Sequence, residues 1–260
     1  MYILNLYAFN LKNILSRHMQ YRFDFLFGLI VSILISVVQP LIQLVFYSGV
    51  NGYEGWSFKQ ILIFQGTLMI WIGLKDTLFG RIRDDVQTMV RDGSFDRMLN
   101  KPYSPLVLIF CGGFNFLGLG SLICGTGFLA YSIRMNGIGF GIPELLLCTV
   151  FMASGLILYI AVLITYCSIL IHLVSMNRLA EVIDKFLRFS EYPLNIYPAS
   201  AQWVLTFILP LALWIYLPSQ AILHRLDKTS VLSIFVSFIL LFLSIQFFKI
   251  SLSRYKSAGG

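Results

Sequence analysis

The side chains best suited to chemistry in this 260-residue chain are charged, and they gather in one short stretch. Residues 81–101 hold nine charged side chains, although the whole chain is 58% hydrophobic and only 12% charged. The charges are of both signs, so this stretch is not simply a basic patch for anionic lipid. Mixed charge around a few apolar side chains is typical of a surface that docks a protein partner. The alternative is a solvated loop that folds back on a membrane.

This charged stretch is predicted to form two short helices. The first should end at Gly93, because glycine readily adopts the conformation that terminates a helix. Ser94 can cap the second helix, and Asp96 in its first turn is favoured by the helix dipole. Pro102 should stop it, since the residue before a proline avoids the helical region. The apolar sides of the two helices are expected to consist of Val86, Met89, Val90, Phe95, Met98 and Leu99.

A second polar set lies inside an apolar run. The members are Ser32, Ser36, Gln39 and Gln43. Their spacing of i, i+4, i+7 and i+11 places them on one face of a helix, and Pro40 should kink that helix. Lipid would not solvate such a stripe, so it should face protein or water. Two interpretations stay open: hydrogen bonds that hold a helix bundle together, or the lining of a translocation path.

Signatures of catalysis and nucleotide binding are missing from the sequence. There is no Gly-x4-Gly-Lys-Ser/Thr phosphate loop, so the chain should not bind ATP by that route. His172 is the only acid–base candidate inside the apolar runs, and its own run holds no second histidine or carboxylate. The four cysteines have no metal-ligand spacing. We therefore predict no catalytic residues, no metal site and no cofactor bound by this chain.

The polar residues must be positioned by long apolar runs. One run, 60–74, is shorter than the others, and Phe79 extends it past the pair Lys75–Asp76; it can cross a bilayer as a sixth helix if that pair extends toward the membrane surface. The runs are too continuous for the alternating strands of a membrane barrel, so an all-α membrane protein with six transmembrane helices is predicted. The five charge-free windows that are long enough to cross a bilayer are 25–53, 102–133, 145–177, 192–224 and 229–248.

Orientation follows from the distribution of lysine and arginine. If the N-terminus is cytoplasmic, 15 of the 19 Lys and Arg residues lie on the cytoplasmic side of the predicted helices. Both termini are therefore predicted to be cytoplasmic. The net charge of +7 is then a signal of membrane topology, and it needs no nucleic acid to explain it.

The chain divides into three parts by this pattern. Residues 1–22 have helical apolar spacing and are predicted to form an amphipathic helix on the cytoplasmic membrane surface. Residues 23–250 form the six-helix transmembrane domain, and residues 251–260 form a short cytoplasmic tail. Within the domain, residues 177–191 are predicted to form a second cytoplasmic interfacial helix.

Prolines and glycines mark two of the predicted crossings. Pro210 lies in the middle of the fifth, 192–224, and is expected to break that helix near its outer end. The third crossing carries a stripe of small residues for which we predict tight helix packing, with a hinge as the alternative. The stripe consists of Gly113, Gly118, Gly120, Gly125 and Gly127.

Two segments carry a resemblance to a known family. They read "GSFDRMLNKPYSPL" from residue 93 and "RFSEYPLNIYPASAQWVLTFILPLALWIYLPSQ" from residue 188. In this order, within the predicted topology, they resemble permeases of ABC transporters of the ABC-2 type. The resemblance covers nearly the whole chain, and it extends to a subgroup found beside bacterial natural-product, bacteriocin or multidrug export systems.

The resemblance implies a function for each segment. The charged stretch would be a coupling loop that inserts into a separate ATPase subunit, which would bind ATP and Mg²⁺. The coupling residues would be Asp92, Gly93, Phe95, Asp96, Arg97 and Leu99, with Pro102 fixing the exit of the loop. Pro210 and Pro218 would form an outer gate, and the polar stripe would face a second permease, identical or related. The implied assembly is an exporter in a bacterial cell membrane, with two ATPase subunits.

Two other classes of function stay open at this stage. One is a transporter or channel that needs no ATPase and uses the charged loop for regulation. The scarcity of charge inside the apolar runs argues against an ion-coupled version of this class. The other is a membrane-embedded enzyme or an assembly factor, for which His172 would be the acid–base residue.

Overall fold

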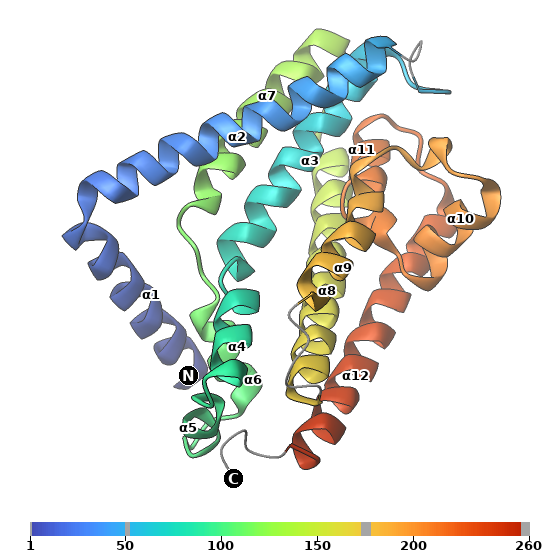
Figure 1. Cartoon of the computed structure of the whole chain (residues 1–260). Helices are drawn as coiled ribbons and strands as arrows, with labels where there is room; N and C mark the ends of the chain where they lie inside the picture. Colours follow the sequence, from blue (N-terminus) through green and yellow to red (C-terminus); the bar gives the residue numbers. More distant parts are fainter. Residues whose placement is uncertain (1, 50–52, 173–177, 256–260) are drawn as a thin grey trace.

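A computed structural model gives the arrangement of the chain, and it describes residues 2–49, 53–172 and 178–255. Within these ranges every regular element is a helix, so the prediction of an all-α protein is confirmed. Four parts of the chain lie outside the described residues: residue 1, residues 50–52 of the predicted first crossing, residues 173–177 at the end of the fourth, and residues 256–260 of the predicted tail. Figure 1 shows an upright group of helices from which the first two lean away.

Four helical segments are long and apolar enough to cross a membrane, judged by length and composition. They are residues 22–43, 58–91, 142–172 and 228–253, and they fall on the first, second, fourth and sixth predicted crossings. The predicted third and fifth crossings are helical too, but each is interrupted. The chain is therefore a multi-pass membrane protein by its helices, while the number of six crossings and the side of each terminus stay predictions.

The N-terminal helix α1 (Tyr2–Gln20) meets α2 (Arg22–Gly49) at a bend at Tyr21. The ring of His18 lies 4.9 Å from that of Phe25 and 5.7 Å from that of Phe116, so an aromatic cluster fixes the bend. α1 lies beside α6 (Pro105–Gly112), as Figure 1 shows. The predicted helix in residues 1–22 is confirmed, and its place on a membrane surface stays a prediction.

The predicted third crossing is split into α6 and α7 (Gly118–Asn136), a break that the sequence analysis did not anticipate. Backbone groups in the break are hydrogen-bonded to the end of α3 (Phe58–Phe79) and the joint that follows it. The Asn115 N–H donates to the Thr77 carbonyl at 2.9 Å, and the Arg81 N–H donates to the Gly113 carbonyl at 3.2 Å. Such pairing is what allows non-helical backbone inside an apolar bundle.

Glycines bring α3 and α7 into backbone contact. A Cβ atom on Gly118 would lie 2.4 Å from the Thr77 nitrogen, and one on Gly125 would lie 2.6 Å from the Ile70 nitrogen. From the other side, a Cβ on Gly73 would lie 2.4 Å from the Leu122 nitrogen. The packing interpretation of the glycine stripe is therefore confirmed at these positions. Gly127 is the exception, because a Cβ there would meet nothing within 4 Å.

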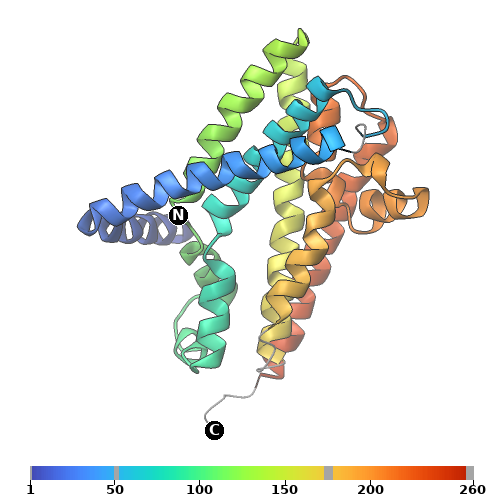
Figure 2. The ribbon, with the colours of Figure 1, turned by 45° about the horizontal axis from the view of Figure 1, so that its top comes forward.

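The predicted fifth crossing is a succession of short helices. The first is α9 (Leu179–Leu187), whose apolar side packs against α8 (Ile142–His172) and α12 (Leu232–Ser253). We predicted that residues 177–191 lie on the membrane surface as an interfacial helix; Figure 1 and Figure 2 instead show α9 standing alongside α8 and α12. The apolar stripe faces α8 and α12 across an apolar cavity of about 470 Å³, and the bundle covers it only in part, because Val182 is 62% and Phe186 44% exposed.

The rest of this segment confirms the interruption by proline. Pro210 separates η3 (Val204–Ile208) from η4 (Leu211–Leu213), and the Leu211 N–H donates to the Leu209 carbonyl across it at 2.6 Å. The remaining short helices are η1 (Arg188–Glu191), η2 (Leu194–Ile196), α10 (Ala199–Trp203) and α11 (Tyr216–Ile222), and η5 (Lys228–Val231) leads into α12.

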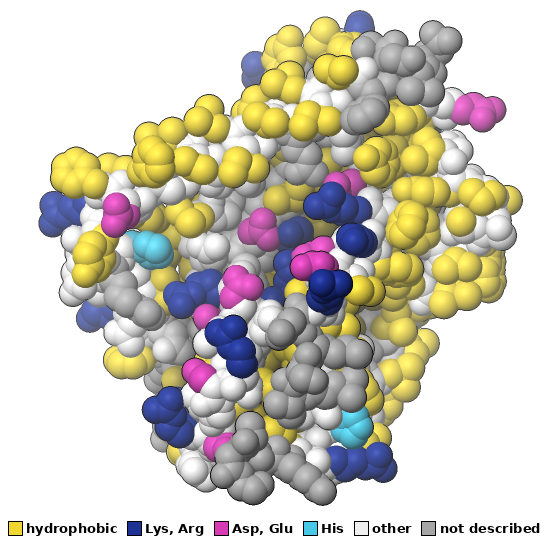
Figure 3. Space-filling view, in the orientation of Figure 1, with side chains coloured by type: hydrophobic (Ala, Val, Ile, Leu, Met, Phe, Trp, Pro, Cys, Tyr) yellow, Lys and Arg dark blue, Asp and Glu magenta, His cyan; other side chains and the backbone are white. Residues whose placement is uncertain are grey.

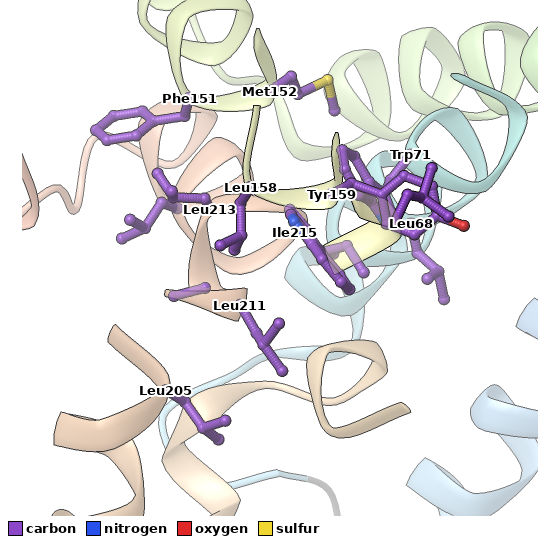
Figure 4. Close-up of a cluster of buried hydrophobic side chains, with 14 of the residues drawn as sticks. Leu68, Trp71, Phe151, Met152, Leu158, Tyr159, Leu205, Leu211, Leu213 and Ile215 are labelled. Atoms are coloured by element: carbon purple, nitrogen blue, oxygen red, sulfur yellow. The ribbon is translucent and has the colours of Figure 1, made fainter. Parts of the chain in front are cut away.

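An aromatic cluster joins this interrupted segment to the rest of the core (Figure 4). Trp71 of α3 stacks on Trp214, with ring centroids 4.9 Å apart and an interplanar angle of 17°, and Tyr159 of α8 meets both rings edge-on. The Trp214 indole N–H donates to the Gly155 carbonyl at 3.0 Å. The three rings thus connect α3, α8 and the chain before α11.

We expect Gly118→Ala to destabilise the protein, because its new Cβ would strike backbone of α3 that cannot move aside cheaply. Overpacking of this kind costs about 1–3 kcal/mol, so the melting temperature of the detergent-solubilised protein should fall. Gly127→Ala is the matched control on the same helix, where the Cβ has open space. If both variants melt at the same temperature as the unaltered protein, the glycine contact between α3 and α7 is not what holds the two helices together.

Candidate coupling loop and transport cavities

The charged stretch forms two short helices, as predicted. α4 (Ile82–Arg91) is followed by a tight turn and by α5 (Phe95–Leu99). Gly93 in the turn has φ +72°, and a Cβ there would meet nothing within 4 Å. The glycine is therefore required by its left-handed conformation and not by lack of space. In Figure 1, α5 lies at the lower end of the molecule, on the same end as the last turn of α12.

The side chain of Asp92 shapes the turn, whereas that of Ser94, the predicted helix cap, does not. The Ser94 side chain makes no capping hydrogen bond to α5, so that prediction was wrong. Instead, the Asp92 carboxylate accepts a hydrogen bond from the Ser94 N–H at 2.9 Å. Its hydrogen bonds with Ser94, helped by Arg97 and Arg91, lower the pKa of Asp92. The carboxylate is exposed, so it remains accessible while it holds the turn.

Phe95 lies inside the molecule, although we assigned it to the contact with an ATPase. Its side chain is 0% exposed, and its ring packs edge-on against Tyr255, with centroids 5.3 Å apart. Burial, together with the carboxylate of Asp96, raises the pKa of Tyr255 to about 12. The apolar side of α5 therefore rests on the chain that follows α12. Phe95 fixes the position of the loop and does not form its outer surface.

The outer surface of the loop is formed by other predicted residues. Asp92, Arg97, Leu99 and Pro102 are all exposed, and the Leu99 side chain is 36% exposed. Arg97 also lines a depression of about 380 Å³, together with Met89, Ser94, Met98 and Lys101. The loop thus presents charge around a shallow recess, which is the geometry that a docking surface requires.

We expect Asp92→Ala to increase the rate of amide hydrogen exchange at residues 92–99, because the Ser94 N–H loses its acceptor. Asp92→Asn keeps an acceptor oxygen and should retain part of the protection. Since the pKa of Asp92 is lowered in the folded chain, its stabilising effect is complete above its unfolded pKa. It is lost as the pH falls through the lower, folded pKa. Equal exchange in the unaltered protein and Asp92→Ala at neutral pH would contradict this assignment.

The polar stripe of α2 faces other parts of the same chain. The Ser32 hydroxyl donates to the Leu117 carbonyl at 2.7 Å, and the Ser36 and Ser121 hydroxyl oxygens are 2.5 Å apart. Gln43 donates to the Glu191 carbonyl at 3.2 Å. These bonds support the packing interpretation of the stripe. The Gln39 side chain lies outside the described part of the structure.

Gln43 also accepts a hydrogen bond from the Nε2 amide of Gln65, and both side chains are buried. The sequence analysis missed Gln65, although a glutamine inside an apolar run is the kind of signal that marked the stripe. Gln43 and Gln65 with Glu191 join α2, α3 and η1 in one polar contact, which we call the glutamine bridge. If the side chain of one glutamine is replaced by an apolar one, the polar group that it contacted is left buried without a hydrogen-bond partner.

We therefore expect Gln65→Leu and Gln43→Leu each to destabilise the protein by about 1–3 kcal/mol, the cost of a buried polar group without a partner. The double variant should cost less than the sum of the two, because it removes donor and acceptor together. Thermal unfolding of the four proteins in detergent measures this coupling. Strictly additive losses would show that the two amides do not interact.

Two cavities lie on either side of α3. The apolar cavity, of about 320 Å³, lies between α2, α3 and α7 and is lined by Ser32 and Ser36 of the stripe. The charged cavity, of about 240 Å³, lies between α3, α4, α8, α9, η1 and the chain around Trp214. Figure 3 shows acidic and basic side chains gathered in the middle of this face, with hydrophobic side chains above them. Ser32 and Ser36 therefore line a cavity and also form the hydrogen bonds that pack α2 against its neighbours.

The two prolines predicted to form an outer gate are inside the molecule, and the histidine considered as an acid–base residue is on its surface. Pro210 and Pro218 are both buried, and Pro218 lies in the first turn of α11, where a missing N–H costs little. His172 is exposed at the end of α8. Among the residues that the structure describes, no three His, Cys, Asp or Glu side chains gather into a group that could hold a metal ion.

The helices and the loop define a class: a multi-pass helical membrane protein with a folded, charged loop at one end of the bundle. Residues 33–259 match the profile of a family described as ABC-2 family transporter protein. This match covers most of the chain, so the chain belongs to the ABC-2 family of transporter proteins. The family comprises permease components of ABC transporters, which generally lack an ATPase site of their own. No curated protein matches the chain significantly.

Proposed function

We propose that this chain is the transmembrane permease subunit of an ATP-driven exporter in a bacterial cell membrane. Two ATPase subunits would bind ATP and Mg²⁺, and two permeases, identical or related, would form the pathway. The proposal includes six crossings, cytoplasmic termini and an interfacial α1. Family membership supports the transporter class, and the form of the loop supports docking to an ATPase.

The observation that carries the proposal is how the loop is connected to the bundle. Residues 58–91 form one helical segment in which Gly80 is itself in the right-handed helical region, with φ −60° and ψ −22°. The exposed loop surface therefore lies at the end of α4, which is joined to α3 by the two residues Gly80 and Arg81. The Arg81 N–H is held by the Gly113 carbonyl at 3.2 Å, so the joint is fixed by the neighbouring chain and a force on the loop would pass through it to α3.

A lateral contact extends this connection to the interrupted segment. Arg83 of α4 forms an ion pair and hydrogen bond with Asp184 of α9. α9 leads directly to the short helices around Pro210. A displacement of the loop would thus reach both α3 and the region that we assign to an outer gate. Rigid-body motion of packed helices is the usual form of such switching.

The first test is the composition of the native complex. We expect the tagged chain, purified from its host in mild detergent, to carry two ATPase subunits and a second permease in mass spectra of the intact complex. The masses would also show whether the two permeases are identical. A chain that stays alone when ATP and Mg²⁺ are added would contradict the proposal and favour a transporter or channel without an ATPase.

The second test is a charge reversal on the docking surface. Arg97→Glu should reduce permease-dependent ATP hydrolysis by at least tenfold. A partner surface complementary to the Arg97 cation would be negative, so the new carboxylate would repel it. Arg97 is exposed and supports the fold only through its attraction to Asp92, so the melting temperature should change little. Arg134→Glu, an exposed arginine in the last turn of α7, is the matched control. Unchanged hydrolysis in Arg97→Glu would remove the loop from the role of coupler.

A further inference from the structure

The apolar and charged cavities share a wall that is one side chain thick. Leu68 and Ile72 of α3 line both cavities. Gln65 and Lys75 lie on the same face of α3 as this pair, because their positions i, i+3, i+7 and i+10 fall within one side of a helix. Gln65 belongs to the glutamine bridge, and Lys75 lines the charged cavity. Because the two cavities adjoin at Leu68 and Ile72, a ligand with an apolar part and a charged part that passes over these two side chains could contact both.

The charged cavity has more cationic than anionic groups in its lining. Lys75, Arg83 and Arg188 line it, against the carboxylates of Asp184 and Glu191. Arg83 is ion-paired with Asp184. The partner of Lys75, at 2.8 Å, is Asp76, which lines the apolar cavity instead.

Arg188 has no ion pair or hydrogen bond of its side chain among the residues that the structure describes. Its guanidinium is exposed, and it borders the cavity from η1. An arginine in this position can form paired hydrogen bonds with a carboxylate or a phosphate. It is therefore the group in the lining most available to an incoming anion.

Three aromatic rings in the lining of the charged cavity strengthen its preference for an anion. Trp71, Tyr159 and Trp214 form one side of the charged cavity, and each ring is held by the other two. A rigid apolar wall lowers the local dielectric constant, so an anion interacts with the nearby cations more strongly than it would in water. Aromatic faces can also attract a cation, but the guanidinium of Arg188 in the same lining, which has no ion pair among the described residues, would repel it.

We propose that the two cavities form one binding site for an amphiphile with an anionic head group. The head would contact Arg188 and Lys75 in the charged cavity, and the apolar part would lie in the apolar cavity beyond Leu68 and Ile72. A carboxylate or phosphate head of this kind can belong to a lipid of the bilayer or to the transported compound. The second source rests on the proposed function; the binding chemistry does not.

The test uses two fluorescent probes with equal chains: a dansylated fatty acid and the corresponding dansylated alkylammonium. Trp71 and Trp214 line the site, so energy transfer from tryptophan to dansyl reports binding to the purified full chain. We expect the carboxylate probe to bind at least tenfold more tightly than the ammonium probe. Equal affinity, or tighter binding of the ammonium probe, would overturn the proposal.

Variants locate the two halves of the site. Arg188→Gln should weaken binding of the carboxylate probe by about tenfold, whereas Lys185→Gln, an exposed cation of α9 that lines neither cavity, should leave it unchanged. Val31→Phe fills the apolar cavity and should weaken both probes. Leu34→Phe, on the same helix outside the lining, is its control. Unchanged affinity in Arg188→Gln at an unchanged melting temperature would remove the head-group site.

Two further measurements separate the sources of the ligand. If the site binds a transported compound, the carboxylate probe should stimulate ATP hydrolysis by the intact complex in proportion to its binding. If it binds a bilayer lipid, the purified chain should retain an anionic phospholipid that Arg188→Gln loses, with no response of hydrolysis to the probe. A chain that carries no ATPase but still selects the carboxylate probe contradicts the proposed function alone.

Discussion

The approach of α3 and α7 at backbone distance is the contact on which the rest of the structure depends. It requires glycine on both helices, at Gly73, Gly118 and Gly125. Because the helices are so close, the end of α3 can bind the free backbone groups of the break between α6 and α7. The break in turn lets α6 run beside α4, so that the chain can return to the bundle from the charged loop. A larger side chain at the contact would separate the helices and leave those backbone groups unpaired in apolar surroundings.

A single helix, α3, connects the features with functional meaning. One of its faces packs on α7, and the rest of its surface borders the two cavities. Its continuation, α4, carries the loop. The helix therefore supports the fold, lines both cavities and leads to the charged loop. The loop itself is fixed by the buried Phe95.

Much of this arrangement could be predicted from local sequence. Long charge-free runs required helices, and the pattern of residues 81–101 predicted two short helices, because both signals depend on neighbours in the chain. Val86, Val90, Phe95 and Met98 of the predicted apolar faces are buried, whereas Leu99 is exposed. Contacts between distant segments could not be predicted in this way. The burial of Phe95 depends on Tyr255, and the position of α9 depends on α8 and α12. The ion pair of Arg83 with Asp184 joins residues that are 101 positions apart.

The loop contacts both of the main helix pairs of the bundle. α4 connects it covalently to α3, and the contact of Phe95 with Tyr255 connects it to the end of α12. α3 pairs with α7, and α12 pairs with α8, so the two attachments belong to different helix pairs. The loop therefore bridges the two helix pairs, so a movement of one pair relative to the other would strain the joint between α3 and α4 or the contact of Phe95 with Tyr255.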